Sequence, residues 1–287
     1  MRISYAKHLL QNTEKSITKI AYECGFATQH TFNRVFLKPV FSPHKNFKNR
    51  FCNGLHHFAY HITDKLFFGG ISLEINHLSI GMTAPDFTAV TTFGPMKMSD
   101  YRGRWVILFS HPGDFTPVCT SEFLAFAQNA PTFDKLNASL IGLSIDSNPS
   151  HLAWVNDIYL TTGVQIPFPV IADRSGDIAR LYGMLAPDVS TTATVRNVYF
   201  IDPNQIVRAI LIYPLTNGRC IAEIIRLLQA MQTTDEFNVI TPSCWQPGDP
   251  VMVPAPGTYE QLVERENNPA GEGLECKDWY WCFKNIG

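Results

Sequence analysis

From about residue 80 to residue 232, short apolar runs alternate with amphipathic segments, and this alternation strongly constrains the fold. The apolar runs predict strands at 105–110, 139–145, 168–172, 197–202 and 206–213. The segments between and after them predict helices at 119–129, 149–160, 175–183 and 219–232. Helices that separate buried strands indicate a layered α/β domain with a mixed sheet.

The first 72 residues differ in charge from the rest of the chain. Residues 1–72 contain ten Lys or Arg and three Asp or Glu, whereas residues 73–287 contain thirteen and twenty-two. This imbalance predicts two units with different partners. Residues 2–11 and 16–24 have helical spacing, and Gly25 precedes a second expected helix, so residues 1–51 indicate a small all-α helix-turn-helix fragment. We expect a linker at 52–72.

Composition excludes several classes of protein. With 45% apolar and 17% charged residues, the chain is neither wholly disordered nor collagen-like. No apolar run approaches the ~20 residues of a membrane span, and the first residues lack the apolar core of a signal peptide. Seven cysteines, an odd number, indicate reduced thiols and a cytoplasmic location.

One cysteine occupies a position suited to chemistry. The predicted strand at 105–110 leads through a short loop to Cys119 in the first turn of the next helix. A helix N-terminus favours a thiolate because its N–H groups are unpaired and the positive end of the helix dipole lies there. Thr116 precedes the sulfur by three residues, where its hydroxyl would bond the sulfur or an incoming oxygen. Pro112 and Pro117 restrict the loop and shield it from water.

The segment PGDFTPVCTSEF resembles the Pro-x-x-x-Thr-x-x-Cys signature of peroxiredoxins. The resemblance continues from about Leu73 to the C-terminus through GMTAPDFTAVTTFG and TPSCWQPGDPVMVPAP. The latter is similar to the clade with a long C-terminal extension. The resemblance implies a thioredoxin-like domain at 73–232 and a peroxiredoxin extension at 233–287. It also implies a thiol-dependent peroxidase that uses no cofactor and reduces hydrogen peroxide and organic hydroperoxides through a cysteine sulfenic acid.

The resemblance also assigns roles to two charged residues. Arg196 matches the catalytic arginine and would hold both the thiolate and the peroxide oxygens, while Glu122 would orient it. Without the resemblance, Arg196 would be a solvated strand-end charge and Glu122 a carboxylate at a helix N-terminus. The peroxidase interpretation requires a sulfur that solvent reaches, with the Arg196 guanidinium close by.

Thiolate formation alone does not account for a fast reaction. An ordinary cysteine with a pKa of about 8.5 is only about 3% thiolate at pH 7. Lowering a thiol pKa by about two units raises this fraction about 25-fold, but nucleophilicity falls about tenfold. Most of the acceleration must therefore come from positioning and from donors to the developing oxyanion. The candidates are Thr116, the backbone N–H of Cys119, and Arg196.

Two further cysteines lie near the end of the chain, in CKDWYWC. Cys276 and Cys282 form at most half of a metal site, and no Cys/His pair at metal-ligand spacing lies nearby, so we expect no metal. The segment resembles the tail of archaeal-type peroxiredoxins, which implies that Cys282 resolves the sulfenic acid of a partner subunit and that Cys276 exchanges with it. A thioredoxin-like or other thiol reductant and a homo-oligomer, either a dimer or a ring of dimers, follow from this resemblance.

The remaining cysteines and one histidine receive no chemical role. Cys24, Cys52, Cys220 and Cys244 are interpreted as packing or surface residues. His111 is expected to be structural or to shape the pocket entrance. A disulfide oxidoreductase is a weaker hypothesis, because Cys119 has no Cys-x-x-Cys partner.

The segment SITKIAYECGFATQHTFNRVF resembles the second helix-turn-helix of AraC/XylS-type transcription regulators. That resemblance places four residues on a recognition helix: Thr28, Gln29, His30 and Asn33. The alternative function is therefore a redox-responsive DNA-binding regulator. However, residues 2–51 cover only about half of such a domain, and Pro39 interrupts its last helix, so a fused remnant or a mis-joined reading frame is the favoured interpretation.

Overall fold

The computed structural model describes residues 9, 17–26, 65–68, 71–74, 78–190, 192–268 and 273–286. It divides into two compact units, Met1–Leu73 and Glu74–Gly287. The larger unit contains the sheet predicted from the sequence and the C-terminal extension.

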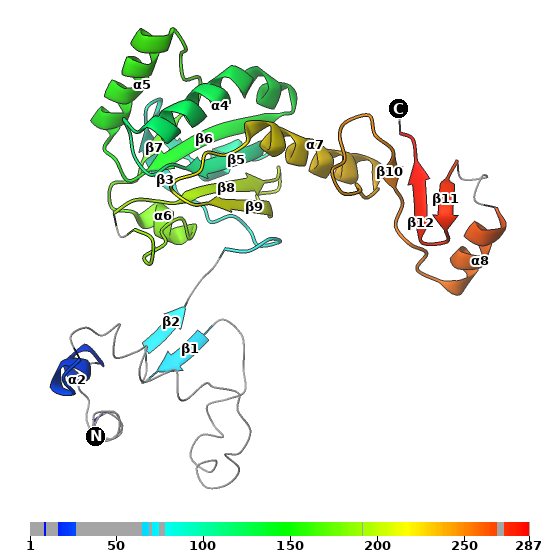
Figure 1. Cartoon of the computed structure of the whole chain (residues 1–287), viewed down its shortest axis with the longest axis horizontal. Coiled ribbons are helices and arrows are strands. Elements are labelled where there is room, and N and C mark those ends of the chain that lie inside the picture. The colour runs from blue at the N-terminus through cyan, green and yellow to red at the C-terminus, as the bar shows by residue number, and fades with distance from the viewer. Residues whose placement is uncertain are drawn as a thin grey trace. The chain divides into compact units, whose positions relative to one another are not determined.

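A seven-stranded mixed sheet forms the centre of the larger unit (Figure 1). Its order is β4-β3-β7-β6-β5-β8-β9. The strands are β3 (Thr88–Thr91), β4 (Gly94–Lys97), β5 (Trp105–Ser110), β6 (Ala138–Ser144), β7 (Val170–Ala172), β8 (Arg196–Ile201) and β9 (Val207–Tyr213). The neighbours β5, β6 and β7 run parallel, and the other pairs are antiparallel. The carboxyl end of β5 therefore lies in the middle of the sheet, where the loop toward Cys119 begins.

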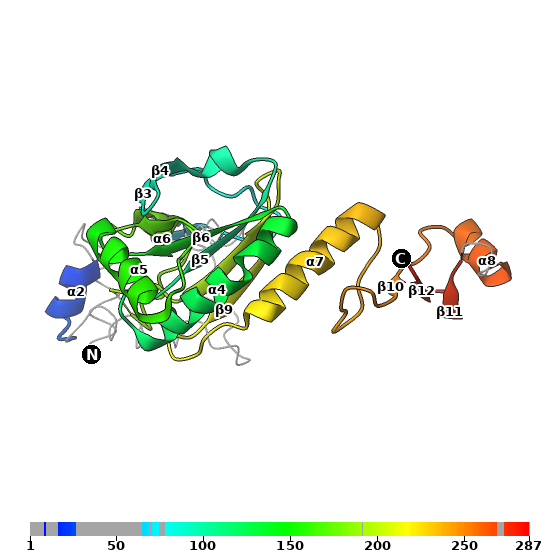
Figure 2. The ribbon, with the colours of Figure 1, turned by 90° about the horizontal axis from the view of Figure 1, so that it is seen from above.

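Helices cover both faces of this sheet (Figure 1). On one face, α4 (Pro117–Lys135), α5 (Asn148–Thr162) and α7 (Ile221–Phe237) pack over an aromatic core that includes Phe109, Phe123 and Phe126. On the other face, α6 (Asp177–Leu181) and the 3₁₀ turn η1 (Met98–Tyr101) contribute to a second core. Figure 2 shows α4 and α7 from above, and they contact each other.

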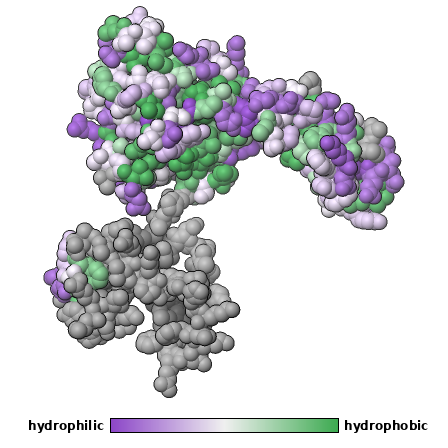
Figure 3. All heavy atoms as spheres, in the orientation of Figure 1, coloured by the Kyte–Doolittle hydropathy of each residue, from purple (hydrophilic) through white to green (hydrophobic). Residues whose placement is uncertain are grey.

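The predicted strands and helices of this region are confirmed, with ends that shift by a few residues. The hairpin of β3 and β4 was not predicted. Its strands are only four residues long, and Val90 is exposed, so the usual alternation of apolar and polar residues is weak. At the opposite edge of the sheet, Ile212 of β9 is 66% exposed, and apolar residues gather over β8 and β9 in Figure 3.

The C-terminal extension contains a small sheet that was not predicted. It has the order β10-β12-β11, formed by β10 (Val251–Met252), β11 (Glu275–Asp278) and β12 (Trp281–Lys284), with α8 (Tyr259–Asn267) between β10 and β11. Trp245 and Val251 pack with Ala230 of α7 in a separate small core. Strands this short, within a Pro-rich segment, give no clear period-two signal.

In the first unit, α2 (Ile17–Glu23) is a helix as predicted, and Gly25 follows it with a φ of 75°. The strands β1 (Lys65–Phe68) and β2 (Ile71–Glu74) pair with each other, so the end of the segment expected to be a linker contributes to a two-stranded sheet. The second predicted helix lies outside the described residues.

Among the residues that the structure describes, no helix is both long and apolar enough to cross a membrane.

Candidate active site

Cys119 is placed by the junction between β5 and α4. The strand ends at Ser110, and the six-residue loop 111–116 ends at Thr116, the extended N-cap of α4 with φ −110° and ψ 146°. Pro117 is the first helical residue, where the missing N–H of proline costs no helical hydrogen bond. Cys119 is therefore the third residue of the helix, in its first turn as predicted.

The structure brings Arg196 and Glu122 together with this cysteine. Arg196 is the first residue of β8, and its Nη1 lies 3.4 Å from Cys119 Sγ and 2.7 Å from Glu122 Oε2. Its Nε and Nη2 both donate to the carbonyl oxygen of Leu215 (3.1 and 2.8 Å). All three guanidinium nitrogens thus donate hydrogen bonds, which fixes the plane of the group beside the sulfur.

A second arginine completes the cluster, and the sequence analysis missed it. Arg219 directly precedes the N-cap of α7 and is fully buried. Its backbone N and Nε donate to Glu122 Oε1 (2.8 and 2.9 Å), and its Nη2 donates to Glu122 Oε2 (2.7 Å). Burial lowers the pKa of Arg219, and the Glu122 carboxylate opposes this effect. The sequence gives no signal for it, because a lone arginine in a Gly-containing turn is ordinarily a surface residue.

The cluster has an unbalanced charge. Glu122 supplies one negative charge, and Arg196 and Arg219 supply two positive ones, all on side chains at most 3% exposed. One buried positive charge is therefore uncompensated within this trio. It stabilises negative charge on the adjacent sulfur, or on an oxygen that approaches the sulfur.

Two expectations about this site are corrected. Cys119 is 0% exposed, so the prediction that solvent reaches the sulfur is wrong for this conformation. The first turn of α4 turns the cysteine toward the aromatic core, against Phe123 and its neighbours. In addition, the Thr116 hydroxyl donates to the carbonyl oxygen of Gly113 (2.8 Å) and not to the sulfur, because the chain turns back on itself in this loop.

The predicted Pro112 lies in this loop and is half-buried. Its neighbour His111 is fully buried and forms a hydrogen bond with Asp114. His111 is therefore an interior residue rather than one at a pocket entrance. Asp114 also contacts His151 of α5, which lies 37 residues further along the chain. The sequence analysis gave no role to either of these two residues.

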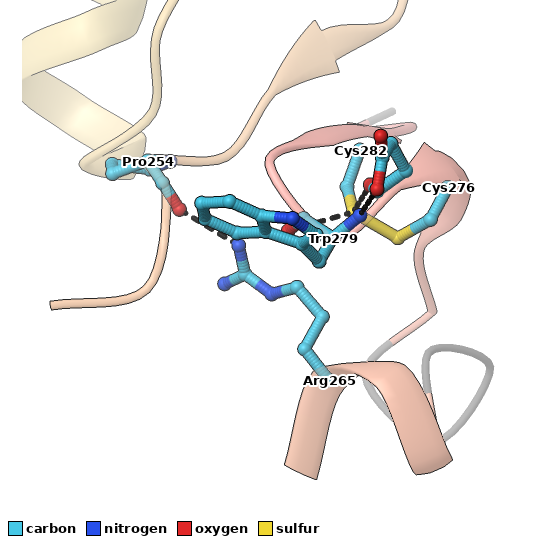
Figure 4. Close-up of a disulfide and its surroundings, with 6 residues drawn as sticks. Pro254, Arg265, Cys276, Trp279 and Cys282 are labelled. Atoms are coloured by element: carbon cyan, nitrogen blue, oxygen red, sulfur yellow. Dashed lines mark hydrogen bonds between the residues drawn. A yellow bond between two sulfur atoms is a disulfide. The ribbon is translucent and has the colours of Figure 1, made fainter. Parts of the chain in front are cut away.

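In the C-terminal extension, Cys276 and Cys282 form a disulfide with each other (Figure 4). They face each other in the register of β11 and β12. The Cys282 side of the bond is buried, whereas Cys276 is half-buried. Figure 4 also shows Trp279 beside the Arg265 side chain, whose Nη1 donates to the carbonyl oxygen of Pro254 (2.9 Å).

The other predicted residues are not part of this site. Cys24 packs in the small core of the first unit, and Cys220 and Cys244 are exposed free thiols. Cys52 lies outside the described residues. The candidate DNA-contacting residues lie outside them as well, namely Thr28, Gln29, His30 and Asn33.

Family models match two parts of the chain. Residues 80–210 match the AhpC/TSA family, and residues 230–268 match the C-terminal domain of 1-Cys peroxiredoxin. The first match contains the junction of β5 and α4 together with Arg196. The second covers the last eight residues of α7 and the start of the extension, including α8.

Curated relatives and solved structures agree with these matches. "Peroxiredoxin 2" of Caldanaerobacter subterraneus subsp. tengcongensis is 58% identical over 207 residues, which are 72% of this chain and 93% of the relative. "Peroxiredoxin" of Aquifex aeolicus is 51% identical over 218 residues, covering 72% and 96%. A solved yeast mitochondrial 1-Cys peroxiredoxin is similar with a TM-score of 0.64 and 38% identity, covering 73% of this chain and 100% of that one. Peroxiredoxin 6 of Arenicola marina has a TM-score of 0.65 and 35% identity, covering 73% and 98%.

Proposed function

Because the chain belongs to the AhpC/TSA family of peroxiredoxins and is a thiol-dependent peroxidase, we propose that Cys119 is the sulfur that attacks the peroxide. The Cys119 thiolate attacks one oxygen of the peroxide, an S–O bond forms, and the O–O bond breaks. The second oxygen leaves with a proton as water or an alcohol. Cys119 becomes a sulfenic acid, and the peroxide takes up the two electrons.

One observation carries this assignment: Arg196 Nη1 lies 3.4 Å from Cys119 Sγ, and the same nitrogen donates to Glu122 Oε2 at 2.7 Å. Arg196 is the group that would hold the departing oxygen as its charge develops. The assignment is tested by the consumption of hydrogen peroxide by the purified full chain with a dithiol donor. Peroxide that persists under these conditions would contradict it.

The burial of Cys119 adds a condition to the reaction. A peroxide reaches the sulfur only if the residues that cover it move far enough to admit a small molecule. The loop at 111–116 and the first turn of α4 lead directly to Cys119, and Phe115 and Pro117 within them are exposed. We propose that this segment opens during each catalytic cycle.

Replacing Arg196 with lysine is expected to slow the reaction of Cys119 with hydrogen peroxide by about 10²-fold. Lysine keeps the charge but not the planar group that spans Cys119, Glu122 and Leu215. The rate is measured in a single turnover by stopped-flow fluorescence. Arg208→Lys is a matched control, because Arg208 pairs with Asp235 on the protein surface and is expected to leave the rate unchanged. Equal rates for the two variants would remove the proposed role of Arg196.

We further propose that Cys282 resolves the sulfenic acid of a partner subunit. Its thiolate attacks the Cys119 sulfur, a disulfide forms, and water leaves. Cys276 then attacks the Cys282 sulfur and releases the Cys119 thiolate, which leaves the pair that the structure contains. A thioredoxin-like reductant supplies two electrons to reopen that pair.

Replacing Cys282 with serine is expected to permit one fast turnover and then to lower steady-state turnover with a dithiol protein by about tenfold or more. The reason is that this variant lacks the Cys282 thiol, which is the group proposed to attack the Cys119 sulfenic acid. Cys276→Ser is expected instead to accumulate a Cys119–Cys282 bond between subunits, seen as a covalent dimer on non-reducing gels. Cys244→Ser, in the same extension, serves as a control that keeps full turnover. Normal cycling of the Cys282 variant would place the resolving role elsewhere.

This relay requires at least a dimer, and we propose a dimer or a ring of dimers. The β9 edge of the sheet, with Ile212 exposed, is a surface available for such contacts. Thioredoxin-like donors are kept reduced in the cytoplasm, which is the compartment we propose. The comparisons give no support to a DNA-binding function for residues 1–51, and no metal or cofactor is part of the proposal.

A further inference from the structure

Beneath the loop that leads to Cys119 lies a buried cluster of His111, Asp114 and His151. His111 Nε2 lies 3.0 Å from Asp114 Oδ1, and His151 Nδ1 lies 2.9 Å from both carboxylate oxygens of Asp114. The other ring nitrogen of His151 lies 3.1 Å from the carbonyl oxygen of Ile171 in β7. Both histidine side chains are fully buried, and that of Asp114 is 2% exposed.

The partners of His151 fix its protonation. A backbone carbonyl oxygen only accepts hydrogen bonds, and so does an ionised carboxylate. Burial by itself raises the pKa of Asp114, but hydrogen bonds from His111 and His151 lower it well below its ordinary value, so this carboxylate is ionised. Both ring nitrogens of His151 must then donate, and the ring is an imidazolium.

Among the described residues that hydrogen-bond to this cluster, no other group supplies a positive charge. Burial lowers the pKa of His111, which is therefore a neutral ring that donates through Nε2. Its Nδ1 has no hydrogen-bond partner among the described residues. The remaining ionisable group at this cluster is Asp146, which is itself an acid and accepts from the backbone N of Asp114 (3.0 Å). His151 alone balances the buried Asp114 carboxylate.

We propose that His151 is a positioning residue of the peroxidase reaction, an imidazolium that anchors the loop before Cys119 through Asp114. Asp114 is the attachment point of that loop: its side chain is held by α5, and its backbone N is held by Asp146 after β6. Two residues later the chain reaches Thr116, the N-cap of α4. A displaced Asp114 therefore displaces the first helical turn and the sulfur with it. This inference rests on the proposed role of Cys119.

The first test uses the unaltered protein. Long-range ¹H–¹⁵N spectra of the ¹⁵N-histidine-labelled full chain, with the His151 signal assigned by its loss in His151→Asn, report how many ring nitrogens carry a proton. The expected result is a proton on both ring nitrogens, because both partners of the His151 ring only accept hydrogen bonds. A His151 ring with one bare nitrogen would overturn the proposal.

The second test is kinetic. His151→Asn keeps a neutral N–H near the position of Nδ1 but removes the charge, and we expect the single-turnover rate with hydrogen peroxide to fall about 10- to 100-fold. Leu152→Gln, at the next residue of α5 and 47% exposed, is the control. In the double variant Asp114→Asn/His151→Asn no charge is left unbalanced, so part of the lost rate is expected to return.

The outcomes separate this proposal from the one it rests on. If the unaltered chain fails to react at Cys119, the proposed function fails. If it reacts and His151→Asn reacts as fast as Leu152→Gln, only the role of His151 is lost. A double variant that reacts no faster than His151→Asn would show that charge balance is not what His151 supplies.

Discussion

Cys119→Ser is expected to abolish peroxide consumption, with a loss of turnover on the order of 10³-fold or more, down to the background of the assay. A serine hydroxyl stays protonated beside Arg196 and does not attack the O–O bond. The change is nearly isosteric in a fully buried position, so the fold is expected to remain. The measurement is hydrogen peroxide loss with a dithiol donor, together with mass spectrometry for a sulfenic acid adduct.

Two free cysteines provide the control for this experiment. Cys220 is the exposed N-cap of α7, next in sequence to Arg219, and Cys244 is an exposed residue of the Pro-rich loop. Both have helix or cation neighbours, yet neither lies in the Cys119 cluster. Cys220→Ser and Cys244→Ser are therefore expected to retain turnover within about twofold. Measurable turnover by Cys119→Ser, or its loss in Cys220→Ser, would move the reactive sulfur elsewhere.

The fold of the sheet was predictable because its central strands are buried on both faces. Trp105–Ser110 and Arg196–Ile201 are buried at every position, and each contains a continuous apolar run in the sequence, WVILF in the first and VYFI in the second. The hairpin of β3 and β4 and the three strands of the extension are short and partly exposed. Strands of two to four residues give too few positions for an alternation of apolar and polar residues to be recognised.

The candidate site was predictable only in part, for a related reason. A loop-to-helix cysteine and the residues of its motif are contiguous, so Thr116, Cys119 and Glu122 are visible in one segment. Arg219 and His151 come from other elements. Arg219 contacts Glu122, which precedes it by 97 residues, and His151 contacts Asp114, which precedes it by 37 residues. Burial of the sulfur was missed because exposure depends on the packing of α4 against the sheet.

Glu122→Gln is expected to lower the free energy of unfolding by about 3–5 kcal/mol. In the native protein the Glu122 carboxylate accepts four hydrogen bonds, three from Arg219 and one from Arg196. Glutamine removes the negative charge and turns an N–H₂ group toward guanidinium donors, so two buried positive charges remain without a counter-charge. The change is measured by urea denaturation, from the midpoint and slope of the transition.

A second Glu–Arg pair in the chain is the natural control. Glu223 and Arg226 lie one turn apart on α7 and are joined at 2.6 Å, but their side chains are 42% and 19% exposed. Solvent screens such a pair, so Glu223→Gln is expected to cost less than about 1 kcal/mol. Equal losses for the two variants would mean that the Glu122 cluster is stabilised by packing alone.

A double variant distinguishes charge from shape at Glu122. Glu122→Gln leaves the trio with two positive charges, whereas Glu122→Gln/Arg219→Gln returns it to the single positive charge of the native protein. If charge imbalance causes the instability, the double variant is expected to be more stable than Glu122→Gln although it has lost more hydrogen bonds. Arg196 then retains its place beside Cys119 through its two bonds to Leu215, and a measurable single-turnover rate is expected to return. Additive losses in the double variant would instead assign the stability to the hydrogen bonds themselves, and the uncompensated charge beside the sulfur would no longer explain how the site stabilises an anion.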